Sequence, residues 1–221
     1  MTIRLVGSTS GYTEIDAPAV AGSNTLLLPT GNGTARQTMM TDGTGALSFV
    51  NDAGAFYYRL DSNLAGANAT GAQSVFGVGV TLAGSTVYQL EVVYVLNKTV
   101  GSTSHTMGFG FGGTATVNNF LLTGVTNEAA NVGVAGLTGG GATWGSDTVS
   151  NATATPSMTS TTHFVMLVAS GSVSINAGGT FIPEYTLSAA PGGAYSTVAG
   201  SYIRFVPIGA AGSNSSQGTW S

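Results

Sequence analysis

The chain has 221 residues, of which five are Lys or Arg and nine are Asp or Glu, so 6% are charged against about a quarter in an ordinary soluble domain. Hydrophobic residues make up 43%, glycine occurs 34 times, the formal net charge is −4, and cysteine is absent. The five basic residues are scattered, so the basic footprint that nucleic-acid binding requires is missing. The lack of cysteine excludes disulfides and thiolate metal sites.

The sequence shows neither an export signal nor a membrane-spanning segment. Residues 1–7 have no apolar core of the kind that signal peptides carry, and they end at a glycine. The longest strongly apolar run, residues 92–96, has the length of a strand and is far too short to span a bilayer. We therefore expect no membrane insertion.

Residues 1–50 predict an extended N-terminal arm of short strands. Short apolar pieces at 3–6, 12–15, 25–28 and 46–50 are separated by turns rich in Gly, Asn, Ser and Asp. None of these pieces has enough apolar residues to bury a core by itself. The arm is therefore expected to dock on, or intertwine with, neighbouring chains.

Residues 51–221 predict a β-sandwich head domain. Longer runs with β-branched and aromatic residues alternate with turn clusters, while helical periodicity is scarcely visible. The predicted strands are 74–80, 87–96, 106–111, 120–122, 163–169, 172–176, 179–187 and 202–206. This spacing favours an all-β, antiparallel, jelly-roll-like β-sandwich.

Two of these strands have a face made of glycine. Residues 77 and 79 share one face of the first, and residues 108, 110 and 112 share one face of the second. A bare backbone face weakens a strand unless another group approaches it closely. We expect these faces to meet an aromatic layer or a neighbouring subunit.

Candidate chemical groups are few, and we expect no catalytic residue, no cofactor and no metal. Residues 108–113 match the dinucleotide fingerprint G-x-G-x-x-G, but the following residues do not read as the required helix. His105 and His163 stand in no metal or triad spacing, and they read as polar residues at strand ends. Asp147 and Glu184 are the carboxylates that a glycosidase would need in the head, but nothing in the sequence pairs them.

Five aromatic residues in or near loops are candidates for glycan or partner contacts. One interpretation is that they stack on sugar rings, and the other, which we favour, is that they fill core or subunit contacts. The five are Tyr57, Tyr58, Trp144, Tyr195 and Trp220.

Three segments resemble proteins of tailed bacteriophages. The segment GSTSGYTEIDAPAVAGSNTLLLP at 7–29 and the segment TDGTGALSF at 41–49 resemble fibre-like segments of virion proteins, particularly those of marine and cyanobacterial phages. The ending GTWS at 218–221, after YIRFVPI at 202–208, is similar to the C-termini of such proteins.

This resemblance implies a non-enzymatic structural protein on the virion surface, either a capsid decoration (cement) protein or a short fibre. It further implies a homotrimer that contacts other virion proteins of the capsid or tail, made in the host cytoplasm and located in the virion. The alternative is a receptor-binding fibre head that recognises a host surface glycan.

Overall fold

The computed structural model describes residues 3–15, 22–23, 25–33, 37–41, 44–51, 55–129 and 142–212. The chain divides into two compact units, Met1–Ala53 and Gly54–Ser221, which we call the N-terminal unit and the head. The predicted boundary lies three residues earlier, between residues 50 and 51. All regular structure in the described ranges is β-strand, and none of those ranges contains a helix that could cross a membrane.

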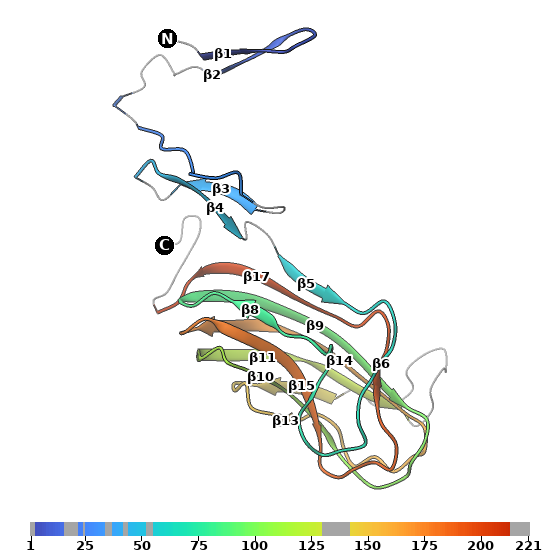
Figure 1. The fold of residues 1–221 in the computed structure, drawn as a ribbon. Coiled ribbons are helices and arrows are strands. Elements are labelled where there is room, and N and C mark those ends of the chain that lie inside the picture. The colour runs from blue at the N-terminus through green and yellow to red at the C-terminus, as the bar shows by residue number, and fades with distance from the viewer. Residues whose placement is uncertain are drawn as a thin grey trace. The chain divides into compact units, whose positions relative to one another are not determined.

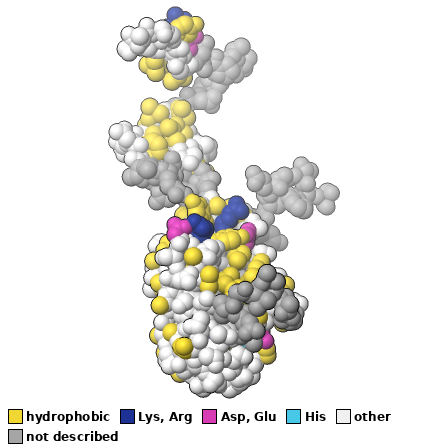
Figure 2. All heavy atoms as spheres, turned by 90° about the vertical axis from the view of Figure 1, so that its right-hand side faces the viewer, with side chains coloured by type: hydrophobic (Ala, Val, Ile, Leu, Met, Phe, Trp, Pro, Cys, Tyr) yellow, Lys and Arg dark blue, Asp and Glu magenta, His cyan; other side chains and the backbone are white. Residues whose placement is uncertain are grey.

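The N-terminal unit consists of two short antiparallel hairpins (Figure 1). The first pairs β1 (Ile3–Val6) with β2 (Tyr12–Ile15), and the second pairs β3 (Gln37–Thr41) with β4 (Leu47–Asn51). Leu27 joins the second hairpin through a parallel bridge to Ala46, with backbone bonds of 2.9 Å to the Gly45 carbonyl and 2.8 Å from the Leu47 amide. Hydrophobic side chains of this unit reach its surface (Figure 2).

The head is a sandwich of an eight-stranded and a five-stranded sheet (Figure 1). In the larger sheet the order is β12-β11-β14-β9, and the far side of β9 pairs with β16 and β17, which in turn pair with β6 and β5. In the smaller sheet the order is β13-β10-β15, and the far side of β15 pairs with β7 and β8. Every strand pair in the head is antiparallel.

The strand bounds of the head follow. The larger sheet contains β5 (Phe56–Arg59), β6 (Leu64–Ala65), β9 (Thr86–Lys98), β11 (Val117–Ala129), β12 (Ala142–Ser146), β14 (His163–Ile175), β16 (Ser196–Thr197) and β17 (Tyr202–Ala210). The smaller sheet contains β7 (Gln73–Ser74), β8 (Val80–Leu82), β10 (Met107–Gly113), β13 (Ala152–Thr153) and β15 (Gly179–Leu187).

These sheets confirm the predicted all-β, antiparallel sandwich, while its jelly-roll connectivity stays a prediction. Two predicted strands, 163–169 and 172–176, are one continuous strand, β14. The predicted strand at 74–80 is wrong, because β7 ends at Ser74 and β8 begins only at Val80. Between them Gly77 adopts a φ of 70°, which bends the chain away from an extended path.

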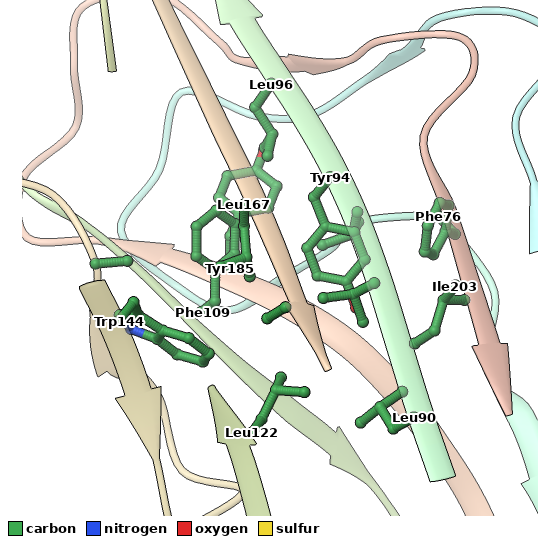
Figure 3. Packing of buried hydrophobic residues seen from close by; sticks show 14 of the residues in the cluster. Phe76, Leu90, Tyr94, Leu96, Phe109, Leu122, Trp144, Leu167, Tyr185 and Ile203 are labelled. Atoms are coloured by element: carbon green, nitrogen blue, oxygen red, sulfur yellow. The ribbon is translucent and has the colours of Figure 1, made fainter. Parts of the chain in front are cut away.

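The core lies between the two sheets and follows the alternation of side chains along the strands (Figure 3). Along β9, every second residue from Tyr88 to Leu96 is buried. The ring of Tyr94 lies 5.9 Å from that of Phe109 on β10, and the ring of Phe205 lies 5.9 Å from that of Phe181 on β15. Aromatic contacts therefore connect the larger sheet to the smaller one.

The glycine face of β10 is covered by the chain's own backbone, so the predicted aromatic layer or neighbouring subunit is wrong here. A Cβ atom added to Gly110 would lie 2.8 Å from Asn151 Cα and 3.0 Å from the Val149 carbonyl oxygen. The Phe111 amide donates to that same carbonyl at 2.8 Å. The segment between β12 and β13 thus packs directly on β10, at a distance that only glycine allows.

Candidate functional site

The N-terminal unit exposes its large apolar side chains. In the described part of the chain, no residue before Leu60 is buried. The exposed large hydrophobic residues of this unit are Ile3, Leu5, Val6, Tyr12, Ile15, Leu26, Leu27, Leu28, Met39 and Met40. An isolated two-stranded hairpin is marginally stable in water. This unit therefore carries apolar surface that its own fold does not cover.

The first hairpin has one apolar face and one mixed face. Ile3 lies opposite Ile15 in the register, and Leu5 lies on the same side two residues along β1. These three side chains are 57–61% exposed. On the other side, the Arg4 guanidinium forms an ion pair with Glu14 and lies 4.2 Å from the centre of the Tyr12 ring. The first hairpin thus pairs its two charged residues with each other and leaves its aliphatic face open.

The five predicted aromatic contact residues fall into three groups. Tyr57 and Tyr58 lie on opposite faces of β5; Tyr57 is 67% exposed and available to a ligand, whereas Tyr58, 42% exposed, packs its ring against the buried Phe76. Trp144 lies on β12 and Tyr195 just before β16, and both are buried in the core at 6% and 0% exposure. A sugar cannot stack on either of these two rings, so the core interpretation holds for them. Trp220 lies outside the described residues.

Five titratable side chains of the head lie close together at strand ends: Lys98, His105, Glu128, His163 and Tyr195. Lys98 on β9 and His163 on β14 are register partners, and both side chains are buried at 2% and 3% exposure. The Lys98 Nζ donates to the carbonyls of Ser160, Gly101 and Thr161 at 2.5, 2.6 and 3.2 Å. Burial lowers the pKa of Lys98 from its ordinary value. The lysine therefore bonds both to the loop that follows β9, at Gly101, and to the loop that precedes β14, at Ser160 and Thr161.

Glu128 and His163 form a close pair beside this lysine. The Glu128 Oε2 lies 2.5 Å from the His163 Nε2, while the Nδ1 of His163 is buried and has no hydrogen-bond partner. The alternation of side chains along a strand could have predicted this position. Lys98 lies two residues after the inward Leu96 on β9, and Glu128 lies two residues after the inward Thr126 on β11. Lys98 and Glu128 are not among the candidates predicted from the sequence.

His105 and Tyr195 form a second buried pair in this cluster. The His105 Nδ1 lies 2.7 Å from the Thr103 carbonyl, so this nitrogen carries the proton and the Nε2 accepts from the Tyr195 hydroxyl at 2.9 Å. Burial, and to a smaller extent the charges of Lys98 and His163, lower the pKa of His105. Burial also raises the pKa of Tyr195 well above its ordinary value.

The polar side chains of this cluster lie next to the apolar core, and they hydrogen-bond to one another or to backbone carbonyls. The Lys98 ammonium bonds to three carbonyls, His105 is held from both ring nitrogens, and Glu128 binds His163. Within the described ranges, no three or more His, Cys, Asp or Glu residues gather closely enough to hold a metal ion. The hydrogen bonds of this cluster connect strand ends of the head with the loops beside them.

The remaining sequence candidates do not meet at a site. Asp147 is exposed in the bend after β12, and Glu184 lies half-buried in the middle of β15. The segment 108–113 with the dinucleotide fingerprint is strand β10, and the next element is strand β11 rather than a helix. The structure thus supplies no phosphate-binding turn at these glycines.

Comparison of the chain with protein-family models, with curated proteins and with solved structures found no match.

Proposed function

We propose that this protein is a non-enzymatic structural component of a bacteriophage particle surface, a capsid decoration protein or a short fibre, that assembles as a homotrimer. The observation that carries the proposal is the N-terminal unit, in which the large apolar side chains that the structure describes are exposed, while Arg4 and Glu14 pair with each other. Such a unit gains its stability when other chains cover it.

The energetics favour assembly through this unit. Fully burying one Leu, Ile or Met side chain contributes about 1.5–3 kcal/mol. The ten exposed large hydrophobic residues of this unit therefore supply enough apolar surface to offset an association cost of roughly 4–15 kcal/mol. The low charge content of the whole chain agrees with this, because charged residues are depleted at the cores of subunit interfaces.

The location on a phage particle rests on the resemblance of residues 7–29 and 41–49 to fibre-like segments of phage virion proteins. The first segment contains strand β2, and the second leads into β4, so both contribute to the hairpins that expose apolar residues. The segments with the phage resemblance and the surface expected to assemble are therefore the same part of the chain.

The trimer is tested by measuring the mass of the full chain in solution by light scattering and native mass spectrometry. We expect three chains per particle. Substituting Leu5→Ser and Ile15→Ser together removes most of the apolar face of the first hairpin, and it should shift the mass to one chain. The matched control is Val78→Ser with Val100→Ser in the head, which are similarly exposed and should leave the mass unchanged. A monomeric parent protein, or a trimer that survives Leu5→Ser/Ile15→Ser, contradicts the proposal.

The location is tested by imaging purified virions with a labelled antibody against the head. Label at a fixed place on the particle, the capsid face or the tail, is the expected result. Particles without label would contradict a role on the virion surface.

A second candidate function is recognition of a host surface glycan by the head. The exposed Tyr57 on β5 favours it, whereas Tyr58 lies on the opposite face of that strand with its ring against Phe76. Retention of the protein on host cells should fall with Tyr57→Ala, and it should not change with Tyr12→Ala in the N-terminal unit. No retention of the unaltered protein on cells would remove this candidate.

A further inference from the structure

The outer face of the eight-stranded sheet carries an apolar band across four strands. In one register row, Val125 on β11, Val168 on β14, Val93 on β9 and Tyr202 on β17 lie side by side. The next row adds Met166 and Val95. Val125 and Val168 are 48% and 41% exposed, although they sit in the middle of their strands.

The composition of the centre of β9 indicates that both of its faces are covered in the assembled protein. Its residues 92–96 read Val-Val-Tyr-Val-Leu, with Val92, Tyr94 and Leu96 buried toward the core and Val93 and Val95 turned outward. A strand with one solvated face alternates apolar and polar residues, whereas a strand buried on both faces is a continuous apolar run. The centre of β9, residues 92–96, has the second pattern, while the outward residues on either side of it, Glu91 and Asn97, are polar.

The charges beside this band complement one another. In the adjoining row, Glu91 on β9 is the register partner of Arg204 on β17. Glu91 accepts a bond of 2.5 Å from the Tyr202 hydroxyl, and Arg204 forms no ion pair with any residue that the structure describes. One acidic and one basic side chain thus border an uncharged apolar band, which suits a surface with the same composition and not a strongly charged partner.

We propose that the outer face of the eight-stranded sheet, centred on Val93, Val125 and Val168, is the surface through which the head docks on the head of a second copy of this chain. In this contact the free Arg204 guanidinium of one head lies next to Glu91 of the neighbouring head. Figure 2 shows one face of the head on which hydrophobic side chains gather beside basic and acidic ones.

This inference rests on the proposed assembly and adds the head surface to it. Once N-terminal units associate, the heads that they carry are held at a high effective concentration. A modest apolar band is then sufficient to bring the heads together, although it need not hold them without the N-terminal units.

The absence of cysteine allows a direct test by thiol labelling. Val168→Cys places one thiol in the apolar band, and Thr81→Cys places a control thiol at an exposed strand position of the smaller sheet. Each thiol is labelled in the full chain and again in the Leu5→Ser/Ile15→Ser background. We expect labelling of Val168→Cys to be about tenfold slower in the trimer than in that background, and labelling of Thr81→Cys to be the same in both.

The outcomes separate the two proposals. A trimer in which Val168→Cys labels as fast as in the monomeric background overturns head docking and leaves the proposed assembly standing. Protection that appears only after another virion protein is added also overturns docking on a second copy. A parent protein that is monomeric contradicts both proposals.

A charge reversal tests the polar border of the same contact. Arg204→Glu places a carboxylate beside Glu91 of the neighbouring head, so it should raise the dissociation constant of the trimer by about tenfold. Because Glu91 is also the register partner of residue 204 in the same head, circular dichroism checks that the variant head stays folded. Asp147→Arg, a reversal at an exposed bend, is the control and should leave the constant unchanged. Combining Arg204→Glu with Glu91→Arg should restore part of the affinity. An unchanged dissociation constant in Arg204→Glu contradicts the contact with Glu91.

Discussion

The head buries an apolar core between its two sheets, whereas no residue that the structure describes before Leu60 is buried. The strands of the N-terminal unit have four or five residues, and the described parts of this unit contain no second sheet that packs on its hairpins. In the head, β9, β11 and β14 each have thirteen residues, and side chains from β10 and β15 pack against their inner face. Strand length and a second sheet, more than composition, decide which unit is self-sufficient.

The largest expected effect comes from truncating a leucine side chain, and we expect it in the head but not in the N-terminal unit. Leu167→Ala empties a fully buried site in the core and should lower the free energy of unfolding of the head by about 2–5 kcal/mol. Leu27→Ala alters a residue that is 64% exposed and should change that free energy by less than about 0.5 kcal/mol. Urea unfolding followed by circular dichroism measures both, and equal losses would contradict the difference between the two units.

A smaller effect is expected from adding one methyl group to a glycine. Gly110→Ala pushes a Cβ atom against the backbone of residues 149–151 and should cost about 1–3 kcal/mol in the unfolding of the head. Gly31→Ala in the N-terminal unit meets no atom within 4 Å, so it should leave that free energy unchanged. If Gly110→Ala is as stable as the parent protein, the backbone packing on β10 is looser than described.

Removing a hydroxyl group should have an effect of about 1–2 kcal/mol in the head. Tyr195→Phe leaves the Nε2 of His105 without its donor inside the core. Tyr12→Phe alters an exposed ring of the N-terminal unit and should be neutral. Thermal unfolding of the two variants provides the measurement, and a stable Tyr195→Phe would show that this hydrogen bond adds nothing.

The smallest expected effect is a loss of stability of the head in weak acid. Because burial lowers the pKa of His105 in the folded head, the unfolded chain binds a proton more readily there. Stability should therefore be full above the ordinary histidine pKa of about 6.5 and should fall as the pH decreases below it toward the lower folded value. His105→Gln should reduce this slope between pH 7 and pH 5. Both histidines of the chain are in the head, so the N-terminal unit should not contribute to this histidine-linked loss.

The long strands of the head could be predicted because local composition determines them. Residues 87–96, 106–111 and 179–187 combine β-branched and aromatic residues with clear turns on both sides, and each lies within a strand or extends one residue beyond it. The segment 74–80 has a similar composition but is not a strand. There the positive φ of Gly77 ends the extended path, and composition alone does not reveal which glycine adopts it.

The burial of Trp144 and Tyr195 could not be predicted from neighbours in the sequence. Trp144 stands beside Gly145, Ser146 and Asp147, which read as a turn, yet pairing with Gly124 on β11 makes this segment a strand. Tyr195 is held by His105, ninety residues away. In both cases a partner distant in the sequence determines the environment of the side chain.

The pairing of β9 on both of its sides has a consequence for the order of events during folding. One edge of β9 pairs with β14 and the other with β17, and β17 also holds β5 near the start of the head. Strand pairs this far apart in the sequence form slowly, because the chain loses the entropy of closing a long loop before the contacts of the pair contribute free energy. While the chain is being synthesised, one edge of β9 stays open until residue 210 has left the ribosome, and an open apolar edge invites pairing with other chains. An incomplete head therefore presents an edge of β9 that β17 covers in the finished sandwich.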